Sequence, residues 1–134
     1  MKNETSRRLT NAAGALERAL GRFDLRPGED EAIAVHKAGD ALADALDDVA
    51  GSMDDGVAAG CIMRVTDTYG EKSFAYLTTK AYQAKGLRTV TNVDSEGRFT
   101  FNADTAKADA FHDAASDMIA VARTIADRIN HAGR

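Results

Sequence analysis

The chain has 134 residues, of which 44% are hydrophobic and 28% charged, and its formal net charge is −4 at pH 7. This length and composition predict one globular domain spanning residues 1–134. No apolar run approaches the ~20 residues that a membrane span needs, and the first residues lack the apolar stretch of a signal peptide. The lone Cys61 excludes an intrachain disulfide, and its apolar flank predicts a buried thiol. Together these features predict a cytoplasmic protein.

Two amphipathic helices are predicted in the first half of the chain, at about 5–23 and 29–53. In both segments apolar residues recur at alternating steps of four and three, which places them on one side of an α-helix. The first series is Leu9, Ala13, Leu16, Leu20 and Phe23. The second series is Val35, Gly39, Leu42, Leu46, Val49 and Met53. Pro27 lies between the two helices and disfavours helix at the residue before it.

Residues 61–102 have a different pattern, which predicts an antiparallel β meander. The segment CIMRVTDTY is rich in residues that favour strands, and LRTVTNV and RFTFN flank the turn sequence DSEG as in a hairpin. Residues 73–85 fit either a strand or a short helix, and alternation with a pair of threonines favours the strand.

A third helix is predicted at about 103–130, with the same steps of four and three. The main series is Phe111, Ala115, Met118, Ala122, Ile125 and Ile129, and a second apolar series is Ala114, Ile119, Val121 and Ala126. A helix with two apolar sides is either central in a monomer or the centre of a dimer, and we predict a homodimer. The order of elements predicts an α+β fold: three long helices, with the meander inserted before the last one.

The negative charge is concentrated in residues 27–60, which hold nine acids and one base. Four of the acids, Asp40, Asp44, Asp47 and Asp48, fall on the side of the second helix opposite its apolar series. Their spacing creates like-charge pairs at i,i+4, which destabilise a helix by a few tenths of a kcal/mol each. Three interpretations follow: a solvated surface, a surface neutralised by arginines of the first helix, or a surface that binds a basic partner.

Signatures of catalysis and of metal binding are missing from the sequence. It contains no nucleophile elbow, no phosphate-binding loop and no calcium loop. His36 and His112, the histidines nearest to aspartates at helical spacing, lie off the apolar series. We therefore predict a protein that is not an enzyme and that has neither a cofactor nor a metal site.

The leading hypothesis is a protein–protein interaction module, such as a small phage-type inhibitor or regulator, whose acidic helix presents nucleic-acid-like charge to a basic protein surface. One alternative is a protein that binds single-stranded nucleic acid through basic and aromatic residues of the β region. Its candidate residues are Arg64, Lys80, Lys85, Arg88, Arg98 and Tyr76. The isoelectric point near 5.3 disfavours that alternative. A second alternative is a small-molecule-binding protein or an enzyme of unknown class.

Overall fold

Four long α-helices make up almost all of the part of the chain that the structure describes. The computed structural model describes the backbone of residues 2–26, 29–84, 92–93, 99–100 and 105–132, and the side chains of residues 4–26, 30–74, 76 and 108–131. The helices are α1 (Lys2–Leu25), α2 (Glu29–Gly51), α3 (Gly56–Ala84) and α4 (Thr105–Ala132).

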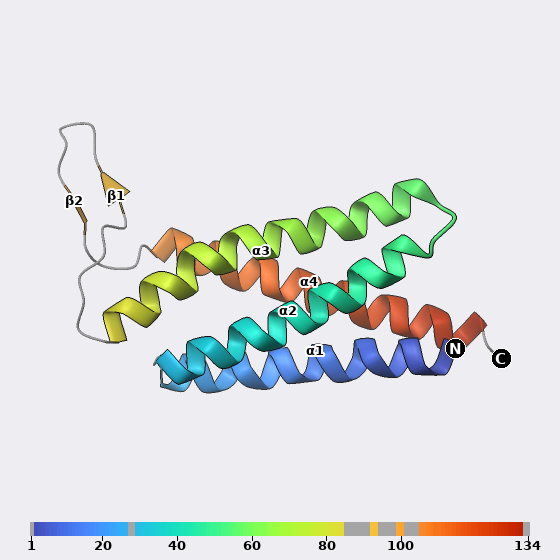
Figure 1. The fold of residues 1–134 in the computed structure, drawn as a ribbon, viewed down its shortest axis with the longest axis horizontal. Helices are drawn as coiled ribbons and strands as arrows, with labels where there is room; N and C mark the ends of the chain where they lie inside the picture. Colours follow the sequence, from blue (N-terminus) through green and yellow to red (C-terminus); the bar gives the residue numbers. More distant parts are fainter. Residues whose placement is uncertain (1, 27–28, 85–91, 94–98, 101–104, 133–134) are drawn as a thin grey trace.

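The helices form an antiparallel four-helix bundle (Figure 1). Each helix packs against the next one along the chain, and α4 returns to pack against α1, while α2 and α4 lie diagonally opposite with much less contact. The start of α1 and the end of α4 lie at the same end of the bundle (Figure 1). The connections after α1 and α2 are short, which favours antiparallel neighbours.

The predicted α+β fold with a β meander is wrong. Residues 61–84, expected to be strands, belong to the single long helix α3, and this includes the part of 73–85 for which a strand was favoured. α1, α2 and α4 occupy the segments where helices were predicted. Two short segments, β1 (Asn92–Val93) and β2 (Phe99–Thr100), pair antiparallel, with Asn92 opposite Thr100 and Val93 opposite Phe99. The rest of the predicted hairpin lies outside the described residues.

α3 is a helix because its buried side follows the same rhythm as the other helices, but with polar and aromatic members. The buried residues step by four and three along Ile62, Thr66, Tyr69, Ser73 and Tyr76. The Thr66 hydroxyl donates to the Met63 carbonyl at 3.0 Å, and the Ser73 hydroxyl donates to the Gly70 carbonyl at 3.2 Å. The Thr66 hydroxyl shares its single hydrogen between the Met63 carbonyl and Asp47 of α2, and with these bonds Thr66 and Ser73 can occupy buried positions.

Asp55 begins α3. One of its carboxylate oxygens accepts hydrogen bonds from the amides of Val57 at 3.0 Å and Ala58 at 3.2 Å. This is the N-cap arrangement, in which a side chain satisfies amides of the first turn that have no partner within the helix. The cap allows α3 to start only a few residues after the end of α2 at Gly51.

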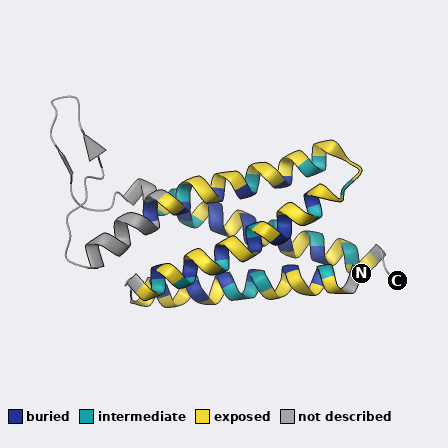
Figure 2. Ribbon diagram, viewed as in Figure 1, coloured by how far each residue is buried: buried dark blue, intermediate teal, exposed yellow. Residues whose placement is uncertain are grey.

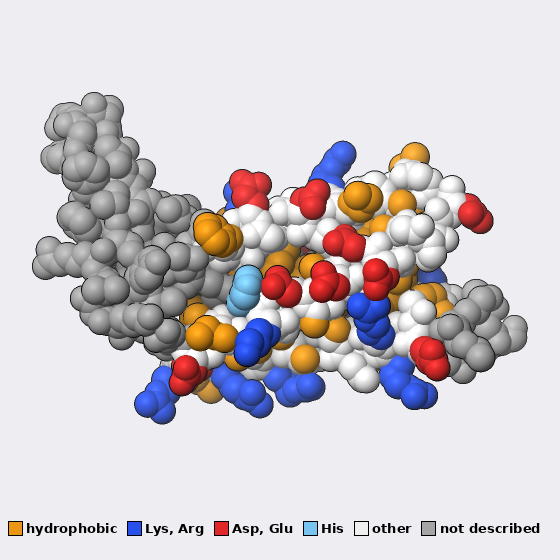
Figure 3. Space-filling model, viewed as in Figure 1, with side chains coloured by type: hydrophobic (Ala, Val, Ile, Leu, Met, Phe, Trp, Pro, Cys, Tyr) orange, Lys and Arg blue, Asp and Glu red, His pale blue; other side chains and the backbone are white. Residues whose placement is uncertain are grey.

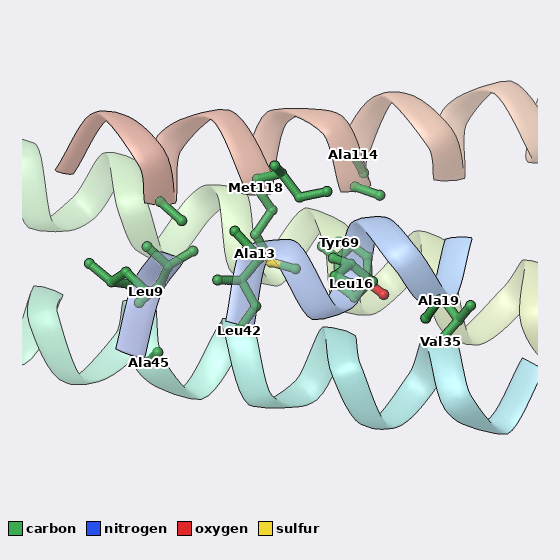
Figure 4. Close-up of a cluster of buried hydrophobic side chains, with 14 of the residues drawn as sticks. Leu9, Ala13, Leu16, Ala19, Val35, Leu42, Ala45, Tyr69, Ala114 and Met118 are labelled. Atoms are coloured by element: carbon green, nitrogen blue, oxygen red, sulfur yellow. The ribbon is translucent and has the colours of Figure 1, made fainter. Parts of the chain in front are cut away.

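One hydrophobic core runs along the bundle axis (Figure 2). Its large, fully buried side chains come from α1, α2 and α4, and the ring of Tyr69 comes from α3. Figure 4 shows Leu9, Leu16, Leu42 and Met118 directed into the space between the helices. Buried alanines between them, such as Ala13 and Ala45, let the helix backbones approach closely.

The second apolar side of α4 is buried within one chain. Ala114, Ile119 and Ala126 are at most 8% exposed and Val121 is half-buried, because α4 packs against both α1 and α3. The Ser6 hydroxyl of α1 also donates to the Ala126 carbonyl at 3.3 Å. The observation on which the homodimer was predicted is thus explained by the monomer, and the homodimer stays a prediction.

Two other features of the fold bear on the sequence predictions. Cys61, for which a buried position was predicted, is exposed on α3. Within the described residues, none of the helices has an apolar stretch long enough to cross a membrane.

Candidate partner-binding surface

The four aspartates of the candidate site lie on the outer side of α2. Val35, Leu42 and Leu46 direct the opposite side of this helix into the core, so Asp40, Asp44, Asp47 and Asp48 are all exposed. Figure 3 shows acidic side chains in a row along α2, with basic side chains along the neighbouring α1. The placement agrees with the helical spacing read from the sequence.

Two of the four carboxylates have partners on adjacent helices. Asp48 accepts a hydrogen bond from the Arg8 guanidinium of α1 at 2.6 Å, in an ion pair exposed to solvent. Asp47 accepts a hydrogen bond from the Thr66 hydroxyl of α3 at 2.9 Å. These contacts orient α2 in the bundle, since Asp48 marks the side of the helix toward α1 and Asp47 marks the side toward α3.

The other two carboxylates meet no lysine or arginine in the described part of the chain. Asp40 lies 3.3 Å from Nε2 of His36, one turn earlier on the same helix. Asp44 makes no hydrogen bond or ion pair within the described residues. Because Asp44 is one turn from both Asp40 and Asp48, it also has a like charge on either side.

The arginines of α1 neutralise this row only in part. Arg8 pairs with Asp48, whereas Arg7, Arg18 and Arg22 form no ion pair with α2 among the described residues. The idea that the chain's own arginines account for the acidic helix therefore applies to one aspartate of the four.

The alternative nucleic-acid-binding residues are not gathered on one surface by the described part of the chain. Arg64 is exposed on α3, where it lines an opening of about 220 Å³ with Asp117 of α4. Tyr76 is only 6% exposed and stacks on Phe111 with ring centroids 5.1 Å apart, so its ring face is not open to a base. Lys80 lies in α3, but its side chain is outside the described residues, as are Lys85, Arg88 and Arg98 altogether.

A second group of titratable side chains lies near the end of the bundle where α1 ends. His112 of α4 approaches the Asp24 carboxylate of α1 at 3.4 Å. Tyr76 lies beside them, and both burial and the charge of Asp24 raise the pKa of its hydroxyl. The His112–Asp24 pair is partly exposed and ties α1 to α4. In the described part of the chain, no group of three or more histidine, cysteine or acidic side chains could hold a metal ion.

Exposed apolar side chains beside the acidic row were missed by the sequence analysis. Ile33 of α2 is 43% exposed, and Met63 and Phe74 of α3 are 52% and 71% exposed. The signal was present in part, because Met63 and Phe74 fall outside the buried series of α3, but it could be read only once that segment was known to be a helix.

Comparison of the chain with protein-family models, with curated proteins and with solved structures found no match.

Proposed function

We propose that the protein is a non-enzymatic, cytoplasmic protein–protein interaction module that binds a basic surface of its partner through the acidic side of α2. The observation that carries the proposal is the pair Asp40 and Asp44, two exposed, like-charged neighbours that meet no lysine or arginine in the described part of the chain. In the sharper form of the proposal, the protein is an inhibitor that occupies a nucleic-acid-binding surface of its partner.

The physical argument rests on the cost of like charges. Aspartates at i,i+4 destabilise a helix by a few tenths of a kcal/mol per pair, and interspersed lysines would remove that cost. A partner that brings lysine or arginine to Asp40 and Asp44 relieves the repulsion when it binds. Complementary charge also steers the encounter and excludes partners of the wrong sign. Because these carboxylates are exposed, binding depends strongly on salt concentration.

A charge-removal variant with a matched control tests the proposal. The variant is Asp40→Asn, Asp44→Asn and Asp48→Asn on α2. The control removes three exposed acids with the same spacing on the diagonally opposite helix α4, by Asp109→Asn, Asp113→Asn and Asp117→Asn. Each tagged protein is used to capture partners from the native cell at low and at moderate salt, after circular dichroism has confirmed equal helix content.

The expected result is a partner recovered by the wild type and by the α4 control, in decreasing amount as salt rises, and not recovered by the α2 variant. Breaking the exposed Arg8–Asp48 pair has little effect on folding, since such pairs contribute ~0–1 kcal/mol. If the α2 variant captures the same proteins with the same salt dependence, the acidic side of α2 is only solvated.

A further inference from the structure

Exposed apolar side chains gather next to the acidic row of α2. In the described part of the chain, five large hydrophobic residues are exposed, and four of them belong to α2 and α3: Ile33, Val57, Met63 and Phe74. Figure 3 shows apolar side chains bordering the acidic row on this side of the molecule. Large apolar side chains exposed next to a charged surface are typical of a protein interaction site.

One contact of α3 with α2 and one opening between α3 and α4 locate Met63 and Phe74 around the helix. Thr66 donates to Asp47, so this side of α3 faces α2, and the opposite flank of α3 borders α4, where Val65 and Thr68 line the opening next to Asp117. At about 100° per residue, Met63 and Phe74 lie about 60° and 80° beyond Thr66, on the flank away from α4. Both side chains therefore lie on the flank of α3 that borders α2.

The same reasoning places residues of α2 next to this flank of α3. Asp40 lies about 20° from Asp47 around the helix, on the flank toward α3, and Ile33 lies about 40° from Asp47, between Asp40 and Asp44. Asp44 lies further out, on the crest of α2. We call the surface formed by Ile33, Asp40, Asp44, Asp47, Met63 and Phe74 the α2/α3 face.

The order of groups along the α2/α3 face follows from the antiparallel packing. Gly39 of α2 meets the Tyr69 ring of α3, so the next turn of α3, with Phe74, lies beside the earlier turn of α2, with Ile33. Met63 lies at the other end, one turn past the Thr66–Asp47 contact. The face thus runs from an apolar end, through carboxylates, to a second apolar end, and the 11 positions from Met63 to Phe74 span about 16 Å.

An unsatisfied hydroxyl lies beneath the centre of this face. Tyr69 is 2% exposed, its hydroxyl reaches Gly39, and it has no hydrogen-bond partner among the described residues. Burial and the nearby Asp40 carboxylate raise the pKa of this hydroxyl. A buried hydroxyl without a partner is destabilising, and a cation held at Asp40 would place positive charge near its oxygen.

We propose that the α2/α3 face binds a basic amphipathic helix of the partner protein. This inference rests on the proposed function and specifies the partner. On one side of a helix, positions i, i+4, i+7 and i+11 are aligned and span about 16 Å. A helix with apolar residues at i and i+11 and lysine or arginine at i+4 and i+7 matches the order of groups along the face. A partner surface that recognises charge alone would make no contact with Phe74, Met63 and Ile33. A bound amphipathic helix would contact both the carboxylates and these apolar side chains.

The test uses synthetic peptides of about 16 residues, long enough to span the face. The patterned peptide has leucine at i and i+11, lysine at i+3, i+4, i+7 and i+8, and alanine and glutamine elsewhere. The scrambled peptide has the same composition and charge without the pattern. Binding to the wild-type protein is measured by calorimetry or fluorescence anisotropy at low and at moderate salt. The variants are Phe74→Ala and Met63→Ala, and the control is Val57→Ala, which removes an exposed apolar group about 180° around α3 from Thr66.

We expect the wild type to bind the patterned peptide more tightly than the scrambled one. Phe74→Ala should weaken binding of the patterned peptide by about tenfold and remove most of the preference, while Val57→Ala should leave both unchanged. Equal binding of the two peptides, or no binding of either, overturns the inference. The proposed function is decided separately by the α2 charge variant, so a charge-dependent partner that tolerates Phe74→Ala would leave that proposal standing without this one.

Discussion

A tight contact between α2 and α3 gives a demanding test of the fold. Gly39 of α2 is buried against the ring of Tyr69 of α3. A Cβ atom added at Gly39 would lie 2.6 Å from Cζ and 2.7 Å from Cε2 of that ring, and closer still to its hydroxyl oxygen. Carbon atoms in contact are normally about 3.5–4.0 Å apart. Tyr69 is 2% exposed and packs against Phe111, with ring centroids 6.0 Å apart, so the ring cannot move into solvent.

Gly39→Ala should therefore destabilise the bundle, although alanine favours helix. Overpacking of a core costs about 1–3 kcal/mol, and replacing glycine by alanine within a helix gains about 1 kcal/mol. The expected net loss is up to about 2 kcal/mol in the free energy of unfolding, or about 4 °C in Tm for each kcal/mol. Gly70→Ala is the control, because no atom outside its own helix lies within 4 Å of the added Cβ, and it should stabilise the protein by up to about 1 kcal/mol.

Urea unfolding followed by circular dichroism measures both variants. Repeating Gly39→Ala in a Tyr69→Leu background isolates the contact, since the penalty should disappear once the ring is gone. If Gly39→Ala stabilises the protein as much as Gly70→Ala does, α2 and α3 do not pack with Gly39 against Tyr69, and the position of α3 in the bundle is incorrect.

Three further predictions concern ionisable and reactive groups. Arg123 donates hydrogen bonds to Glu17, and these bonds together with its charge hold the pKa of that carboxyl below its usual value. The pair therefore stabilises the fold above the pKa of Glu17 in the unfolded chain, and this stabilisation is lost as the pH falls through the pKa in the folded protein. Arg123→Ala should raise the Glu17 pKa in an NMR titration, and an unchanged pKa would contradict the contact. Burial raises the pKa of Tyr69 and Tyr76, so the two neutral hydroxyls stabilise the fold below the pKa of tyrosine in the unfolded chain, and this stabilisation is lost as the pH rises through the pKa in the folded protein. In an alkaline titration followed by absorbance and circular dichroism, both should ionise together with the loss of helix. Ionisation near pH 10 with the helices intact would argue against their burial. Cys61 is exposed, so one equivalent of a thiol reagent should label the native protein at a rate close to that in denaturant, whereas slow labelling would indicate a buried thiol.

The limits of prediction from this sequence are clearest at α3. Periodicity of apolar residues located the other helices, but the buried series of α3 contains Thr66 and Ser73, which a search for apolar residues passes over. The β-branched and aromatic residues of this segment also favour strands. Asp55 is a helix N-cap, but it lies between the predicted second helix, which ends at about 53, and the predicted meander, which begins at 61. Identifying that cap would have favoured helix over strand.

The candidate site was predictable in position but not in its contacts. Helical spacing placed the four aspartates on the outer side of α2, where the structure has them. The pairing of Asp48 with Arg8 spans 40 positions and depends on which flank of α2 faces α1. The exposure of Met63 and Phe74 beside the aspartates likewise depends on the packing of α3, because spacing within one helix does not specify its neighbours.

The footprint of the captured partner on the protein most directly tests whether the partner binds the acidic side of α2. The backbone amides of the isotopically labelled protein are followed by NMR while the partner, or its basic segment, is added. We predict shifts concentrated between Asp40 and Asp48 of α2 and between Met63 and Phe74 of α3, with little change between Asp109 and Asp117 of α4. A footprint on α1 and α4 that leaves α2 and α3 unchanged would contradict the claim that the acidic side of α2 binds the partner.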